Sequence, residues 1–345
     1  MKKKIIRILA IVLIPTACLY FLQLLFMPKY VSDINEGSMI EEYYKSSKNH
    51  EVLILGDCEV YENISPVTMW EEYGITSYIR GSSEQLIWQS YYLLEDTLKY
   101  ETPKVVVLNV LAMQQSEAKS EAYNRMTLDG MRWSFSKLNS IKESMTEEES
   151  IISYVFPFLR YHSRWSELTS DDIKYMFNKP NVTTNGYLMQ VGVRPMTVAP
   201  QEVPLKNYQF SERNYNYLDK IRQLCEEKGI KLVLMKAPSM YPYWYEQWDT
   251  QIKEYADKYN LLYLNMIEQS EKIGIDYTTD TFDYGQHLNV DGAEKLSKYL
   301  GKILKDKYDL TDYRNNQEYQ KTWDTLTEQY HREKENKLKE WENIQ

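Results

Sequence analysis

The chain has 345 residues, enough for one large domain or two medium ones with a full hydrophobic core. Its 50 acidic and 41 basic residues give a net charge of −9, which argues against nucleic acid as the main partner because nucleic-acid binders usually carry a basic face. Three cysteines provide no disulfide framework, and the four histidines show no metal-ligand spacing. We therefore expect neither a disulfide scaffold nor a metal centre.

Residues 1–28 predict a transmembrane anchor. Residues 5–27 are almost entirely apolar and long enough to cross a hydrocarbon core of about 30 Å as a helix. Lys2, Lys3, Lys4 and Arg7 precede this run and few basic residues follow it, which places the N-terminus in the cytoplasm and the body outside. The competing interpretation is a cleaved signal peptide, but the run exceeds the usual apolar length of one and shows no clear small-x-small site.

The next segments predict a tether and the first half of a sheet domain. Residues 29–48 are polar and mixed, with one short helix near 39–44. Residues 49–112 alternate apolar strands at 52–55, 75–79 and 105–110 with helices that begin after Ser65 and after Gln85. Short connections between such elements predict right-handed crossovers and a parallel sheet.

The alternation is lost over residues 113–210, which we interpret as a largely helical insertion that caps the domain. Pro157 and the aromatic residues of this stretch favour an ordered segment. Arg132 and Arg160 are candidate contacts for an anionic or sugar substrate, as are His162 and Arg164. The alternative is that these side chains are solvated or internally paired cations.

The alternation resumes over residues 211–308. Helices at 215–228 and 245–259 separate strands at 231–236 and 261–265, and a closing helix extends to about 307. Five strands with flanking helices predict an α/β, flavodoxin-like fold with three layers and a parallel sheet. Residues 309–345 predict a polar helical tail that packs on the body or meets a partner.

Cys58 follows the first strand through a turn at Gly56. Open α/β folds bind ligands at the carboxyl ends of their strands, where N–H groups of the following helical turn face the ligand. A thiol held there is a candidate nucleophile. The competing interpretation is a small buried hydrophobic residue, because free cysteines are among the most buried residues.

Four sequence blocks together resemble the SGNH/GDSL hydrolase family. They are Gly56-Asp57-Cys58 after the first strand, Gly81 after the second, Asn109 in the third, and Asp283 with His287 before the last helix. With the anchor, the segments 56–59 and 287–295 are similar to membrane-anchored bacterial members such as the D-alanyl-transfer protein of teichoic acids and the alginate O-acetylation proteins.

The resemblance implies an SGNH hydrolase-like sheet with Cys58 as nucleophile, His287 as base and Asp283 as the acid that orients it. It also implies oxyanion donors from the backbone of Cys58 and Gly81 and from an Asn or Gln side chain. Asn109 lies earlier in its strand than the family's Asn, so Gln85 is a rival donor.

Two departures from the family pattern matter. The family nucleophile is a serine, and the family's last block usually places Asp and His three residues apart, whereas Asp283 and His287 are four apart with Gly285 between them. Asp280 is therefore a rival orienting acid. A thiol beside an imidazole is expected to have a lowered pKa and to be a strong nucleophile, so the chemistry tolerates Cys58.

These features lead us to expect an extracytoplasmic acyltransferase or esterase that acts on O-acyl groups of cell-envelope polysaccharide or teichoic acid at the bacterial cell membrane. Lys236 joins Arg132 and Arg160 as a candidate substrate contact, and no cofactor is expected. The resemblance implies a membrane-bound O-acyltransferase as a partner. The alternative is a catalytically silent module that binds glycan or scaffolds a membrane acylation complex.

Overall fold

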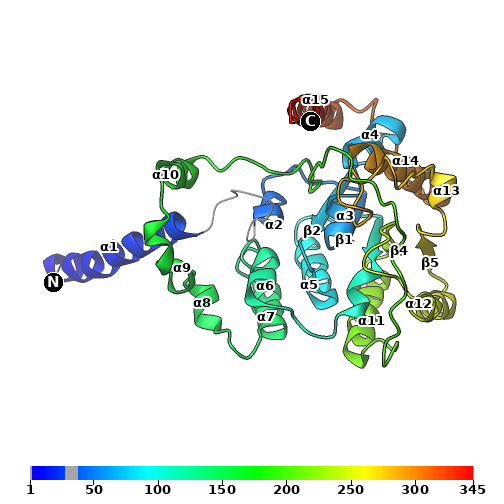
Figure 1. Cartoon of the computed structure of the whole chain (residues 1–345). Coiled ribbons are helices and arrows are strands. Elements are labelled where there is room, and N and C mark those ends of the chain that lie inside the picture. The colour runs from blue at the N-terminus through cyan, green and yellow to red at the C-terminus, as the bar shows by residue number, and fades with distance from the viewer. Residues whose placement is uncertain (1, 28–37, 345) are drawn as a thin grey trace.

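The computed structural model describes residues 2–27 and 38–344. Its centre is a parallel sheet in the order β2-β1-β3-β4-β5, which is the flavodoxin-like order and confirms the predicted α/β class (Figure 1). The strands are β1 (Val52–Gly56), β2 (Ser77–Gly81), β3 (Val105–Asn109), β4 (Lys231–Lys236) and β5 (Leu262–Asn265). The prediction for β2 was wrong by two residues, because pairing with β1 starts at Ser77 and aligns Gly81 with Gly56.

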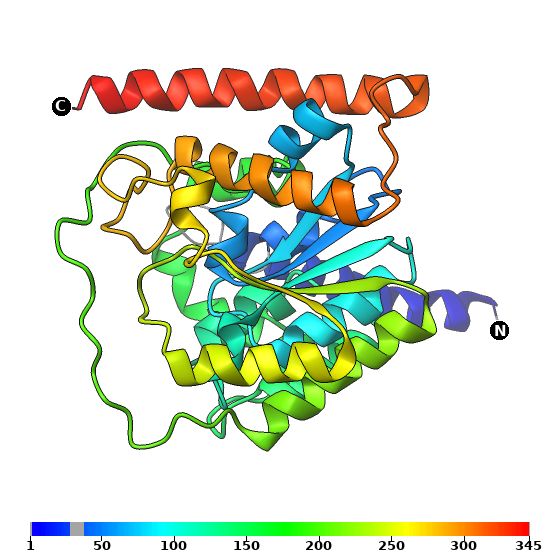
Figure 2. The same cartoon turned by 90° about the vertical axis from the view of Figure 1, so that its right-hand side faces the viewer.

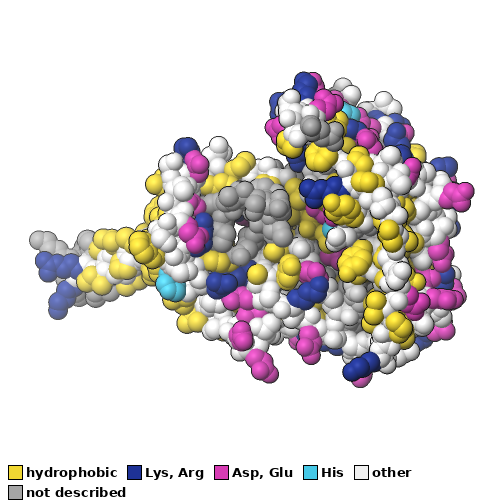
Figure 3. All heavy atoms as spheres, viewed as in Figure 1, with side chains coloured by type: hydrophobic (Ala, Val, Ile, Leu, Met, Phe, Trp, Pro, Cys, Tyr) yellow, Lys and Arg dark blue, Asp and Glu magenta, His cyan; other side chains and the backbone are white. Residues whose placement is uncertain are grey.

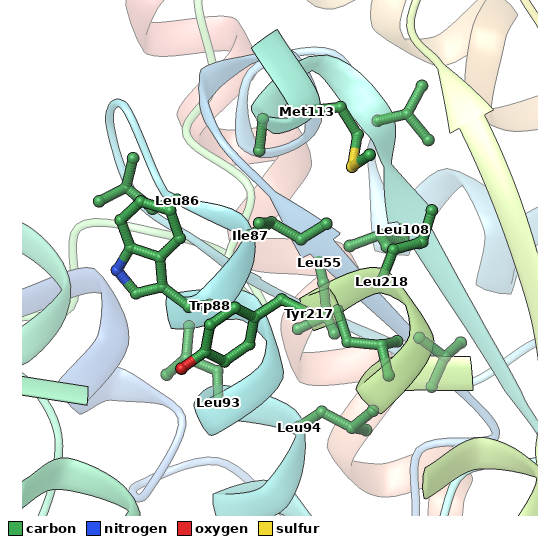
Figure 4. Close-up of a cluster of buried hydrophobic side chains, with 14 of the residues drawn as sticks. Leu55, Leu86, Ile87, Trp88, Leu93, Leu94, Leu108, Met113, Tyr217 and Leu218 are labelled. Carbon is green, nitrogen blue, oxygen red and sulfur yellow. The ribbon is translucent and has the colours of Figure 1, made fainter. Parts of the chain in front are cut away.

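Helices cover both faces of the sheet and bury alternate strand residues. Leu53 and Leu55 face a cluster that includes α5 (Ile87–Thr97), α11 (Glu212–Glu227) and α12 (Glu246–Tyr259), part of which Figure 4 shows. Val52 and Ile54 face the opposite cluster, which includes α3 (Cys58–Tyr61), α4 (Pro66–Tyr73) and α14 (Val290–Lys307). The short helix α13 (Ser270–Ile273) follows β5. Strands buried on both faces explain the continuous apolar runs in the sequence.

The two helices of the second cluster that frame the site have clear start signals. The Ser65 hydroxyl accepts the N–H of Thr68 at 3.2 Å at the start of α4, and Pro66 occupies the first turn. The Asn289 side chain caps α14 by accepting the N–H of Gly292 at 3.2 Å. These caps fix the points at which the chain enters both helices, next to the ends of the strands.

The N-terminal helix α1 (Lys2–Phe26) extends away from the body (Figure 1). Its segment Leu9–Phe26 has a mean hydropathy of 2.3 and is, among the described residues, long and apolar enough to cross a membrane. Residues 28–37 of the predicted tether lie outside the described residues. The following helix α2 (Ser38–Glu42) packs into the body, and Ile40 and Tyr43 are fully buried, so this half of the predicted tether belongs to the fold.

The insertion has a helical first part and an irregular second part. The first part consists of the 3-10 helices η1 (Val110–Gln114) and η2 (His162–Ser166) with α6 (Glu121–Leu128), α7 (Phe135–Ser144), α8 (Ile151–Val155), α9 (Phe158–Tyr161) and α10 (Ser170–Phe177). The second part contains residues 187–196, here named the return segment, which runs back along the body. The Leu188 N–H of this segment donates to the carbonyl of Tyr61 in α3. Its Gln190 carbonyl accepts the N–H of Val290 at the start of α14.

The tail forms the long helix α15 (Gln317–Glu342), which lies across α4 and α14 (Figure 2). Trp323 is buried and stacks on Trp70 with ring centroids 5.0 Å apart. Further along the helix, Lys337 donates to the carbonyl of Met189 at 2.7 Å. The tail therefore packs on the body and contacts the return segment.

Candidate active site

The turn after β1 places Cys58 at the carboxyl edge of the sheet. A Cβ atom at Gly56 would lie 2.7 Å from the Cβ of Asn109, so only glycine fits between the two strands. Asp57 caps α3 by accepting the N–H of Glu59 at 3.1 Å, which makes Cys58 the first residue of the helix. The N–H of Cys58 consequently belongs to the first turn, where backbone donors have no partner within the helix.

A buried polar network supports this turn from below. The Asn109 amide donates to Asp57 Oδ1 at 3.2 Å and to Glu59 Oε2 at 3.0 Å, and Lys236 Nζ donates to Glu59 Oε1 at 2.7 Å. Burial, followed by the charge of Glu59, raises the pKa of Asp57 to about 7. Asn109 Oδ1 accepts the N–H of Ala237 at 3.2 Å, so the network joins β1, β3 and β4.

His287 reaches the thiol from the loop before α14. Its imidazole lies close enough to the Cys58 thiol for each group to shift the pKa of the other. Asp283 Oδ2 lies 2.7 Å from His287 Nδ1, and Asp283 Oδ1 accepts the His287 N–H at 2.7 Å. The Phe282 ring stacks on the imidazole with centroids 6.0 Å apart. Because Nδ1 faces the carboxylate, Nε2 is the ring nitrogen that can accept a proton from the Cys58 thiol.

A second carboxylate, which the sequence did not suggest, lies beside the same ring nitrogen. Glu62 Oε2 is 3.3 Å from His287 Nδ1, and Glu62 Oε1 accepts the Gln190 amide at 2.8 Å. Glu62 follows Cys58 by four residues, a spacing that places two side chains on one side of a helical turn and was the available signal. The rival orienting acid, Asp280, instead pairs with Lys295 at 2.6 Å.

The protonation of the pair differs from the sequence expectation. Burial raises the pKa of Cys58 to about 12, although His287 acts in the opposite direction. Burial alone would lower the pKa of His287, but Cys58, the Asp283 hydrogen bond and Glu62 raise it well above its usual value. Burial thus favours the neutral thiol, the carboxylates favour the protonated imidazole, and His287 must lose its proton before it can act as a base toward Cys58.

The structure places the predicted oxyanion donors in two groups. Gly81 lies beside the nucleophile turn, since a Cβ there would be 3.1 Å from the Gly56 carbonyl oxygen. The Gln85 amide is buried and donates to the Arg80 carbonyl and to Ser90 Oγ, at 3.2 and 2.9 Å. The amide groups of Gln85 and of Asn109 are thus engaged within the interior.

The predicted substrate contacts are not brought together at Cys58. Lys236 is fully buried in the network below the turn. The Arg132 guanidinium lies 4.5 Å from the ring centroid of Tyr44, whose hydroxyl donates to Asp96 near the end of α5, at the opposite edge of the sheet. Arg160 pairs with Glu121 at 3.0 Å within the insertion. Among the described residues, no cluster of three or more potential metal ligands was found.

Backbone hydrogen bonds hold the His287 loop against the return segment. Arg194 donates to Thr281 at 3.0 Å, Tyr284 donates to Arg194 at 3.1 Å, and Met196 donates to Tyr277 at 2.9 Å. The irregular part of the insertion therefore forms one wall of the candidate site, a role that its sequence, which lacks periodicity, did not indicate.

No family model matches the chain, and no curated protein matches it. Two solved structures with low similarity are a candidate acylhydrolase from Bacteroides fragilis and a GDSL-like lipase from Bacteroides thetaiotaomicron. The first is 10% identical, with a TM-score of 0.36 over 75% of this chain and 89% of its own. The second is also 10% identical, with a TM-score of 0.33 over 77% of this chain and 95% of its own.

Proposed function

We propose that the protein is an extracytoplasmic acyltransferase or esterase that acts on O-acyl groups of cell-envelope polysaccharide or teichoic acid. The observation that carries the proposal is the contact series from Cys58 through His287 to Asp283 at the carboxyl edge of the sheet. A nucleophile, a base and an orienting acid in this order are the arrangement used for acyl transfer on several unrelated folds.

In the proposed reaction, His287 Nε2 accepts the thiol proton while the sulfur attacks the ester carbonyl. Backbone N–H groups of Cys58 and Gly81 stabilise the oxyanion of the tetrahedral intermediate. The C–O bond of the ester then breaks, and the leaving alkoxide takes the proton from His287. In the second half, water or a sugar hydroxyl attacks the thioester carbonyl and gives its proton to His287. The C–S bond then breaks, and the leaving thiolate takes this proton from His287, which restores the free thiol.

Anchoring of the protein in the membrane through α1 would favour a substrate in the cell envelope. The exposed apolar helix α1 supports anchoring in the membrane, with its basic N-terminal flank in the cytoplasm and the sheet domain outside. A body held there is close to lipid-linked donors and wall glycans. A membrane-bound O-acyltransferase is the proposed partner that would supply acyl groups from the other side.

A catalytically silent glycan-binding or scaffolding module is the second candidate. It is favoured by the raised pKa of Cys58 and by the interior engagement of the Asn109 and Gln85 amides, which leaves only backbone groups as proposed oxyanion donors. An enzyme and a scaffold differ in their need for the thiol and the imidazole.

The deciding experiment incubates the full-length protein with p-nitrophenyl acetate and searches for acetyl on cysteine by peptide mass spectrometry. We expect a thioester on Cys58 that is absent in His287→Ala, while the buried Cys225 remains unmodified as an internal control. In cells, Cys58→Ala should lower the O-acyl content of the wall. An unmodified Cys58, with wall acylation unchanged in Cys58→Ala, would establish the silent module instead.

A further inference from the structure

The helical part of the insertion carries an exposed apolar surface. Ile152, Phe156 and Leu159 are 53%, 46% and 50% exposed, and they lie three to four residues apart along α8 and α9. Ile152 belongs to α8, Phe156 to the short connection that follows it, and Leu159 to α9, so exposed apolar side chains recur along this whole stretch. Soluble surfaces tolerate single exposed apolar residues, but a contiguous group marks an interaction site.

Exposed apolar side chains also lie on η2 and α10, which follow in the chain. Trp165 is 72% exposed, and Ile173 and Phe177, four residues apart on α10, are 55% and 77% exposed. The other side of α10 faces the protein, because Asp172 is buried and pairs with Arg164 at 3.4 Å. The helix α10 is therefore amphipathic, with its apolar side directed away from the body.

This surface adjoins the end of the candidate membrane span. The helices α9, η2 and α10 all contact α1. The rings of Phe26 and Phe158 meet edge to face with centroids 5.0 Å apart, and Arg164 Nη1 donates to the Phe26 carbonyl at 2.7 Å. Phe26 is the last residue of the span Leu9–Phe26, so the insertion holds the helix at the level where it leaves the hydrocarbon. Hydrophobic side chains continue from α1 onto the adjoining body (Figure 3).

We propose that the apolar side chains between residues 151 and 177 form a lipid-binding surface that rests in the outer interface of the bilayer beside α1. The occupant is phospholipid: the apolar side chains enter the acyl boundary, and Lys174 and Arg160, 75% and 42% exposed at their side chains, lie at the level of the phosphates. The inference rests on the proposed function only in taking α1 as a membrane anchor. Contact at both α1 and the insertion fixes the orientation of the sheet domain above the membrane.

Continuity with α1 argues for lipid over a protein occupant. Whatever surrounds the last turn of the span also meets the side chains packed beside it, and a bilayer surrounds a single helix on every side that the protein leaves open. A polytopic partner on this surface is an outcome that the test below separates from lipid.

The chain provides a direct test because its first tryptophan is Trp70, so α1 itself contributes no tryptophan fluorescence. The full-length protein is placed in nanodiscs of phosphatidylcholine and phosphatidylglycerol, with and without bromine on the acyl chains. We expect bromine-dependent quenching in the wild type, most of which is lost in Trp165→Phe. The matched control Trp341→Phe, on α15, should keep it. Equal quenching in the wild type and Trp165→Phe would overturn the proposal. The absence of quenching in these bilayers, which contain no partner protein, would also overturn it and is the result expected if the surface binds a polytopic partner.

A second pair of variants tests the surface without removing the reporter. Ile173→Glu with Phe177→Glu should lower the quenching of Trp165 more than twofold, because charged side chains leave the acyl boundary. The control, Val198→Glu with Val203→Glu, changes two side chains that are 74% and 67% exposed elsewhere in the insertion and should have no effect. Equal quenching in both double variants would contradict the proposal. Acetylation of Cys58, measured in detergent on the same preparations, reports on the active site alone, so the two proposals can fail separately.

Discussion

Asp283 holds His287 at two points, the ring Nδ1 and the backbone N–H, each at 2.7 Å. The extra residue between them is accommodated because Tyr284 and Gly285 adopt left-handed backbone conformations, with φ of 64° and 91°. The four-residue spacing therefore still brings Asp283 to the imidazole, and with Nδ1 next to the carboxylate the other ring nitrogen, Nε2, is free for Cys58.

Replacing the orienting carboxylate should slow acyl transfer. We expect Asp283→Asn to lower the rate of Cys58 acetylation by about 10²-fold, since general-base assistance is worth roughly 10²–10⁴-fold. When the rates are compared at a pH at which His287 is neutral in every variant, Glu62→Gln should have a smaller effect, because Glu62 lies farther from Nδ1, and the double variant should have the largest. Stopped-flow release of p-nitrophenol measures these rates. An unchanged rate in Asp283→Asn would show that the pair does not support the chemistry.

The pH dependence should follow the imidazole. His287 acts as a base only when neutral, and its pKa is raised well above the usual value, so the acylation rate should rise with pH through that raised pKa. Removing a neighbouring negative charge destabilises the imidazolium and lowers the pKa, so Glu62→Gln should shift the profile to lower pH. A full pH profile of the initial rate in both proteins checks the direction of the shift. A shift to higher pH would contradict the assigned contact.

Serine should replace the nucleophile better than alanine does. At neutral pH the thiol is protonated, because burial raises its pKa to about 12, and it must lose its proton during the attack, as a serine hydroxyl does. We expect Cys58→Ser to release p-nitrophenol at a rate within about 10²-fold of the wild-type rate, because the same general base can assist a hydroxyl. Cys58→Ala should show no release above background. If Cys58→Ser were as inactive as Cys58→Ala, a preformed thiolate would be the better description.

Lys236 should support the fold and not contact substrate. Its ion pair with Glu59 is buried on both sides, and loss of one partner leaves an unpaired buried charge. Lys236→Met should lower the free energy of unfolding by about 3–5 kcal/mol, measured by urea denaturation. Lys298→Met removes the exposed partner of Glu72 and should cost at most about 1 kcal/mol. A raised KM with unchanged stability in Lys236→Met would instead indicate a substrate contact.

The tail should stabilise the wall of the active site. A Cβ at Gly192 would lie 2.9 Å from the Trp341 ring, so the ring covers the return segment directly. Trp341→Ala should increase hydrogen exchange at the amides of Arg194 and Met196 by roughly tenfold, about 1.4 kcal/mol of local opening free energy. Trp133→Ala changes an exposed ring on the other part of the insertion and serves as the control. Unchanged exchange in Trp341→Ala would show that the tail and the loop are independent.

Local signals were sufficient for the sheet and for the position of Cys58 at the end of β1, because short apolar runs predict strands buried on both faces and Gly56 marks the turn. His287 was assigned through the resemblance of its sequence block to the SGNH/GDSL family, since no local pattern placed it near Cys58. The strand β2 was misplaced because Ile75 and Thr76 are β-branched and favour a strand, although the pairing with β1 begins at Ser77.

Features that depend on distant contacts could not be predicted. The spacing from Cys58 indicates that Glu62 lies on the side of the nucleophile, but its contacts with His287 and with Gln190 of the return segment come from parts of the chain far away in sequence. The thiol pKa depends on burial by elements far apart in sequence, so the expected lowering gave the wrong direction. The interior engagement of Asn109 and Lys236 likewise follows from how β1, β3 and β4 pair, which residue types alone do not reveal.

The arrangement of the strands also sets an order in time. Cys58 precedes β4 and β5 in the chain, His287 follows them, and α15 is synthesised later still. A nascent chain therefore carries the thiol long before the imidazole that lies beside it in the folded protein. The return segment, likewise, is made well before the Trp341 ring that covers it, so the wall of the site gains its cover only when the last helix is complete.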